Sequence, residues 1–125
     1  MSKQLIRIVL PQLARRLQPQ VQAYRDGELS DSQFARKFEG LLQHQYAWLA
    51  KRGVPEPEAA VAIHSAVLVL SGPGLRAEAE QLKMPLEVVE YRAVRTAAAD
   101  ISANYGVSQA RATRQISAIL AQYGD

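Results

Sequence analysis

With 125 residues, 48% of them hydrophobic, the chain is long enough for one compact core and too short for two ordinary ones. It contains no cysteine, which excludes disulfides, thiolate metal ligands and a cysteine nucleophile. The net charge of +3 is uneven, because residues 1–25 carry basic groups and no acidic one, whereas the other 100 residues hold 10 basic and 12 acidic groups. A basic end can attract phosphate or an acidic partner, although such charges are more often the solvated face of an amphipathic helix.

The N-terminal segment does not predict export, because its apolar run from Leu5 to Leu10 is interrupted by Arg7 and ends at Pro11. The most apolar window, residues 59–70, is well short of the roughly 20 residues that a membrane-spanning helix needs. We therefore expect a cytoplasmic location with no membrane partner, and a buried core helix at residues 59–70.

The first helical segment is predicted from apolar residues that recur at steps of three and four between Ile6 and Tyr24, and it is expected to end at Asp26-Gly27. A kink or a restart is predicted at one or both of Pro11 and Pro19, because proline lacks a backbone donor and disfavours a helical conformation in the residue before it. An extended segment at residues 5–10 is the alternative. The apolar stripe comprises Ile6, Leu10, Leu13, Leu17, Val21 and Tyr24.

A second amphipathic helix follows the turn at Asp26-Gly27 and runs to about Arg52. Ser30 or Asp31 can cap its first turn. Its stripe comprises Phe34, Phe38, Leu41, Leu42, Gln45, Trp48 and Leu49.

Residues 58–70 predict a helix that is apolar almost all round, which must be covered on several sides and is expected at the centre of the fold. Ser71-Gly72-Pro73-Gly74 is expected to break the chain firmly. Three further helices are predicted, over about residues 75–83, 86–105 and 109–123. The expected fold is all-α: a single compact domain of about six helices, with N-terminal helices and core in residues 1–70 and a helix-turn-helix-like part in residues 71–125.

Residues 100–116 can form two short helices joined by a tight turn at residues 105–108. Ser102 lies four residues before Gly106, Val107 follows it, Ser108 can cap the next helix, and Ala112 falls six residues after the glycine on the inward face. This spacing resembles the helix-turn-helix of the lac repressor family, whose second helix reads DNA. The resemblance covers about a seventh of the chain.

A second match lies at residues 78–92, where a small residue precedes the turn by four positions and Val89 follows Lys83 by six. It is similar to the helix-turn-helix of many regulators and of sigma-factor-like domains. Lys83 stands where glycine is usual, so it must tolerate a left-handed backbone at a moderate steric cost. The two matches share the helix at residues 86–105, so they cannot both present an equivalent reading helix to one groove.

Charge favours the last helix as the reading helix. Glu87 and Glu90 near the start of the preceding helix would repel phosphate, whereas residues 108–123 contain two arginines and no acidic residue. The resemblance places Gln109 and Ala110 at base-contacting positions, although alanine offers only an apolar contact. The predicted DNA-contacting residues are Ser108, Gln109, Arg111, Thr113, Arg114 and Gln115.

The same region also has a purely structural interpretation. Gly106 and Ser108 are ordinary helix caps, which close any helical hairpin. Residues 71–125 are neutral in formal charge, which favours this interpretation. The inward stripe of the last helix would then comprise Ala112, Ile116, Ile119 and Leu120.

The sequence contains no recognisable catalytic or metal-binding constellation. Neither His44 nor His64 has a histidine or carboxylate three or four residues away, so we expect no metal, no cofactor and no enzymatic activity. His64 is expected to be a core imidazole with its hydrogen bonds satisfied, and the Ser65 hydroxyl is expected to bond back to its own helix.

We therefore expect a small DNA-binding or transcription-associated protein that uses a C-terminal helix-turn-helix on double-stranded DNA. A homodimer could accompany this function, with the N-terminal helices supplying the interface. The alternative is a non-enzymatic helical adaptor or scaffold that binds a protein partner through an apolar groove or its basic N-terminal helix.

Overall fold

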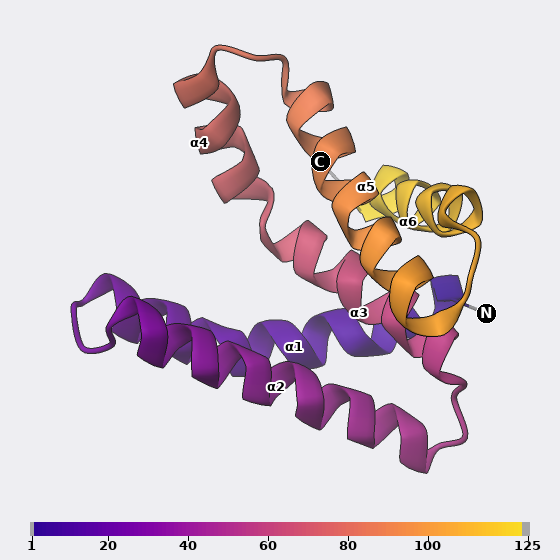
Figure 1. The fold of residues 1–125 in the computed structure, drawn as a ribbon. Helices are drawn as coiled ribbons and strands as arrows, with labels where there is room; N and C mark the ends of the chain where they lie inside the picture. Colours follow the sequence, from indigo (N-terminus) through magenta and orange to yellow (C-terminus); the bar gives the residue numbers. More distant parts are fainter. Residues whose placement is uncertain (1, 124–125) are drawn as a thin grey trace.

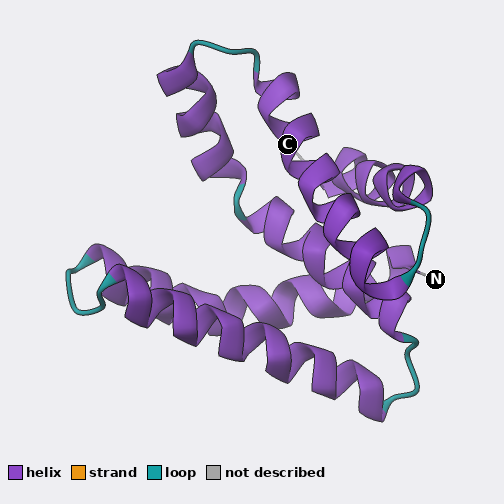
Figure 2. Cartoon of the chain, viewed as in Figure 1, coloured by secondary structure: helices purple, strands orange, loops and turns teal. Residues whose placement is uncertain are grey.

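Six α-helices make up most of residues 2–123, the part of the chain that this computed structural model describes (Figures 1 and 2). They are α1 (Ser2–Arg25), α2 (Asp31–Lys51), α3 (Glu56–Leu70), α4 (Gly72–Leu82), α5 (Leu86–Tyr105) and α6 (Gln109–Tyr123). No strand occurs within residues 2–123. The all-α prediction and the predicted single helical domain are confirmed.

Helix α1 runs through both of its prolines, so the predicted restart and the extended segment at residues 5–10 are wrong. Pro11 and Pro19 are both exposed. A proline leaves the carbonyl four residues before it without its helical donor. Here those carbonyls belong to the exposed residues Arg7 and Arg15, where water can supply the missing hydrogen bond.

Two local features, a glycine after α1 and a capping box before α2, form the turn between these helices. Gly27 has a left-handed backbone with φ of +79°, as expected for a glycine after a helix. Ser30 then caps α2: its hydroxyl accepts a hydrogen bond from the Gln33 backbone N–H (3.2 Å), and Gln33 Oε1 accepts one from the Ser30 backbone N–H (2.8 Å). This reciprocal capping box confirms Ser30 as the cap.

Helix α3 lies at the centre of the fold and contacts each of the other helices, which confirms its predicted position. Its buried residues are mostly small, so neighbouring helices can approach closely on several sides. They are Ala59, Ala60, Val61, Ala62, Ile63, Ser65 and Ala66.

The break after α3 is much shorter than predicted, because Ser71 alone separates α3 from α4. Gly72, Pro73 and Gly74 form the first turn of α4 instead of a loop. Proline is tolerated there because the first backbone N–H groups of a helix have no intrahelical partner. Within residues 2–123 no single helix is both long and apolar enough to cross a membrane; α3 and α4 pass that test only as a pair bent by 61°.

Helix α4 ends at Leu82, and the next residue, Lys83, adopts the left-handed conformation (φ 56°, ψ 42°) that its place in the turn was predicted to require. The Met84 backbone N–H donates to the Ala79 carbonyl (3.0 Å), and the Lys83 N–H donates to the Glu80 carbonyl (3.3 Å). These bonds satisfy carbonyls at the end of α4 and offset the steric cost of a side chain in this conformation.

Figure 1 shows two arms that diverge from the centre: the α1–α2 hairpin on one side, and α4 with the start of α5 on the other. Among residues 4–51, the buried side chains of α1 and α2 are Ile6, Val9, Leu13, Gln45 and Leu49, and the four apolar ones share one buried cluster with α3. No residue from 14 to 44 is buried. We call residues 14–44 the hairpin arm.

Candidate nucleic-acid interface

The turn between α5 and α6 uses the residues that carry the helix-turn-helix resemblance. Gly106 is left-handed (φ +69°), and its backbone N–H donates to the Ser102 carbonyl (3.0 Å). Ser108 Oγ then accepts a hydrogen bond from the Arg111 backbone N–H (3.4 Å), which caps the start of α6. Ala112 is fully buried, as its inward position requires.

Helix α6 lies behind α5 in the view of Figure 1. It runs from the turn back toward the start of α5, where Leu120 and Tyr123 share a cleft with Glu87 and Glu90. Its inner face is anchored by Ala112, Ile116 and Ile119, which are buried. Because α6 contacts both α3 and α5 through this face, its outer face remains open to solvent.

The six predicted contact residues are not equally accessible. Ser108, Gln109, Arg111 and Arg114 are exposed, whereas Thr113 and Gln115 are half-buried. The Thr113 hydroxyl donates to the Gln109 carbonyl (2.8 Å), so its hydrogen is already engaged within the helix. Within residues 2–123 neither the Arg111 nor the Arg114 guanidinium forms a hydrogen bond or an ion pair, so both remain available to an external acceptor.

The charge around α6 is asymmetric along its axis. No acidic residue occurs in Gln109–Tyr123, and the helix N-terminus adds partial positive charge near Gln109. Glu87 and Glu90 lie at the opposite end, where they line a cleft of about 390 Å³ together with Leu120 and Tyr123. The N-terminal half of α6 is therefore the end suited to an anion.

The second helix-turn-helix match is less suited to this role. The reading helix there would be α5, whose first turn carries Glu87 and therefore repels phosphate. Leu82, Val88 and Tyr91 are 49%, 39% and 54% exposed at this corner, so apolar side chains lie among its exposed basic residues Lys83, Arg92 and Arg95.

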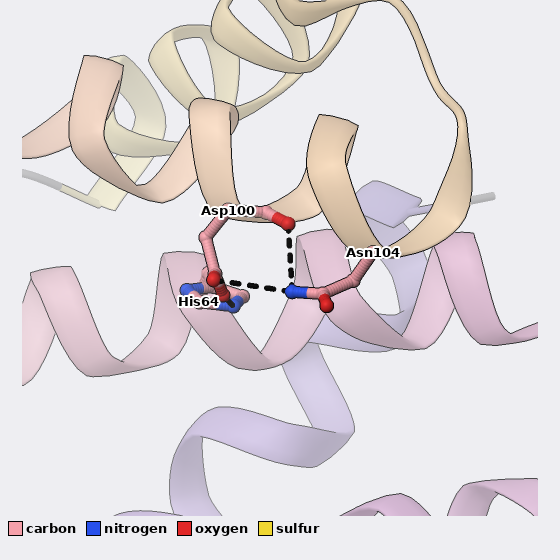
Figure 3. A network of polar contacts seen from close by, with 3 residues as sticks. All are labelled: His64, Asp100 and Asn104. Carbon is pink, nitrogen blue, oxygen red and sulfur yellow. Dashed lines mark hydrogen bonds and ion pairs between the residues drawn. The ribbon is translucent and has the colours of Figure 1, made fainter.

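A polar cluster that sequence analysis missed joins α3 to α5 (Figure 3). His64 Nε2 lies 3.4 Å from Asp100 Oδ2, and Asn104 Nδ2 donates to the backbone oxygen (2.9 Å) and Oδ1 (3.1 Å) of Asp100. The His64 side chain is 28% exposed, so the prediction of a core imidazole is wrong. Burial lowers the pKa of His64 below its ordinary value, and the Asp100 carboxylate partly opposes that shift.

This cluster lies in a groove of about 590 Å³ between α3, α4 and α5. Thr96 is the hydroxyl-bearing residue among those that line this groove. Its hydroxyl donates to the Arg92 carbonyl on the same helix (3.0 Å) and is therefore not poised as a nucleophile. Among residues 2–123, no three histidine or acidic side chains are grouped so that they could hold a metal ion. The cluster fits a polar link between helices better than a catalytic pair.

Ser65, next to His64, also differs from expectation. It is fully buried, but within the described residues its hydroxyl has no hydrogen-bond partner, so the predicted bond to its own helix is wrong. A buried hydroxyl without a partner loses its hydration with no compensating bond, which costs stability.

We therefore expect Ser65→Ala to raise the free energy of unfolding by about 1–2 kcal/mol, because it removes the unpaired oxygen and improves helix propensity. Urea unfolding followed by circular dichroism measures the change. Ser71→Ala is the matched control: the Ser71 hydroxyl donates to the Val67 carbonyl (2.7 Å), so its removal should be neutral or destabilising. A loss of stability in Ser65→Ala would contradict the assignment of this hydroxyl as unpaired.

Comparison of the chain with protein-family models, with curated proteins and with solved structures found no match.

Proposed function

We propose that this protein binds double-stranded DNA by placing the N-terminal half of α6 in the major groove. The observation that carries the proposal is the combination, on one helix, of exposed Gln109, Arg111 and Arg114 with no acidic residue and with an opposite face buried in the core. The major groove is wide enough to admit an α-helix, and arginine and glutamine are residue types that hydrogen-bond to base edges.

Each exposed residue has a distinct role in this proposal. Gln109 reads a base edge, the small Ala110 allows close approach and contacts a thymine methyl group, and Arg111 and Arg114 contact phosphates or guanine. Ser108 faces the backbone, where its hydroxyl and the adjacent helix N-terminus favour a phosphate. A role in transcription regulation and a cytoplasmic location belong to the same proposal.

Wild-type protein should bind a fluorescently labelled duplex of mixed sequence, and anisotropy should show affinity falling steeply with salt. If about three phosphates are neutralised, the association constant falls about 40-fold between 50 and 200 mM salt, because each contact releases condensed counterions. The control is a single-stranded oligonucleotide of the same length. The proposal would be contradicted if no duplex binding is seen at 50 mM salt, or if the association constant does not change with salt concentration.

A second candidate function, a non-enzymatic adaptor or scaffold for a protein partner, is favoured by another surface. Leu82, Val88 and Tyr91 are exposed apolar side chains around the α4–α5 turn, and Arg95 lies over the Tyr91 ring at 5.9 Å. An aromatic side chain beside an arginine is typical of a protein-binding surface. Tyr91→Ser should leave duplex binding unchanged if α6 is the DNA-binding element.

A further inference from the structure

The hairpin arm lacks an interior of its own. Its residues 14–44 include no buried side chain, whereas the segments on either side of it reach the core at Leu13 and Gln45. Two packed helices shield only the surfaces between them, so an amphipathic pair that projects from a domain leaves part of each apolar stripe in contact with water.

The arm nevertheless carries the side chains of a core. Tyr24 and Phe34 have ring centroids 4.9 Å apart, and Phe34 and Phe38 are stacked at 6.3 Å, which gives the arm an aromatic centre. A cavity of about 290 Å³ runs along α1 beside Leu17 and Val21, and Leu70 at the end of α3 also lines it. The partly exposed apolar residues of the arm are Leu17, Val21, Tyr24, Leu29, Phe34, Phe38, Leu41 and Leu42.

The charges of the arm are segregated along its length. The tip contains Asp26, Glu28 and Asp31 with one basic residue, Arg25, and the stem of α1 contains Arg15 and Arg16; all six are exposed. On α2, Arg36 and Lys37 add exposed basic charge and Glu39 adds one exposed acidic group. Within the described residues none of these charges forms an ion pair, and the tip and the α1 stem are about 15 Å apart at 1.5 Å per residue.

We propose that two copies of this chain pair through their hairpin arms, antiparallel about a two-fold axis, to form an intermolecular four-helix bundle. In this arrangement the acidic tip of each arm lies against the basic stem of the other, and the aromatic centres of both arms meet near the axis. A surface that carries both complementary charge groups at opposite ends is self-complementary, as a two-fold interface requires. A second copy therefore fits the arm better than an unrelated partner.

This pairing goes beyond DNA binding and does not depend on it, because the arm and α6 are separate surfaces. It would bring two copies of α6 into one particle. The pairing is measured without nucleic acid, so its failure would leave the DNA proposal intact, and the reverse also holds.

Reversing the charge of exposed residues at the stem or at the tip tests the proposal. Because these residues are exposed, their replacement should leave the fold intact. Sedimentation velocity at low salt should show wild-type protein at twice the mass of one chain. The double variants Arg15→Glu/Arg16→Glu and Asp26→Lys/Glu28→Lys should each dimerise at least about tenfold more weakly, because like charges then meet twice in each dimer.

An equimolar mixture of the two variants should restore dimerisation to nearly the wild-type strength, since each acidic stem then faces a basic tip. Arg76→Glu/Arg95→Glu is the matched control, with the same charge change outside the arm, and it should dimerise like the wild type. Circular dichroism confirms that helix content is retained. Wild-type protein that stays monomeric at about 100 µM, or a mixture that is no stronger than either variant alone, overturns the proposal.

Discussion

Ile116→Ala is expected to lower the free energy of unfolding by about 2–5 kcal/mol, because Ile116 is fully buried in the face by which α6 packs on the core. The cost has two parts: the lost transfer of apolar surface out of water and the cavity that the truncated side chain leaves. The rigid helices around this position limit how far the core can collapse to fill that cavity.

Chemical denaturation followed at the helical circular dichroism signal measures this effect. Ser117→Ala, at the next position on the exposed side of α6, is the control and should change stability by no more than about 0.5 kcal/mol. If Ile116→Ala costs less than about 1 kcal/mol, α6 is not anchored as described. In that case its outer face would not be held in one orientation, and the DNA proposal would lose its structural basis.

Arg111→Ala together with Arg114→Ala is expected to weaken duplex binding about 10–100-fold at 50 mM salt. If both arginines contact phosphates rather than guanine, the slope of the logarithm of affinity against the logarithm of salt should also decrease by about 1.8. Neither guanidinium is used in an intramolecular contact within the described residues, so helix content and unfolding midpoint should stay unchanged.

The matched control for the arginine pair is Arg76→Ala with Arg95→Ala, which removes the same charge from exposed positions on α4 and α5. Anisotropy under identical conditions compares the two. If both pairs weaken binding equally, net charge rather than α6 governs the interaction, and the reading-helix assignment fails. If neither pair matters, the nucleic-acid surface lies elsewhere on the molecule.

Local chemistry explains which parts of the fold could be predicted from the sequence. The turns at Ser30, Lys83 and Gly106 were predictable because capping depends on residues within one helical turn of each other. The central position of α3 was predictable because a helix without a polar face must be covered on several sides. Element bounds were less secure: Gly72-Pro73-Gly74 has the composition of a loop, but proline and glycine also fit the first turn of a helix.

Contacts between distant segments explain the rest. Asp100 lies beside His64 only because α5 packs on α3, and no spacing in the sequence indicates that pairing. Whether the Ser65 hydroxyl is paired depends on rotamers and packing, which a residue pattern does not contain. The sequence showed that the six predicted contact residues are of types that can bind DNA. It could not show that Thr113 and Gln115 are partly buried, because their burial depends on how α6 packs on the core.

The position of α3 in the middle of the chain has a consequence for biosynthesis. During translation the first 55 residues leave the ribosome before the helix on which α1 and α2 pack exists, so Ile6, Val9 and Leu13 have no surface to cover them at that stage. A C-terminal fragment beginning at α4 would similarly leave the inner face of α6 without α3. We therefore expect α5 and α6 not to fold as an isolated fragment, because the inner face of α6 packs on α3.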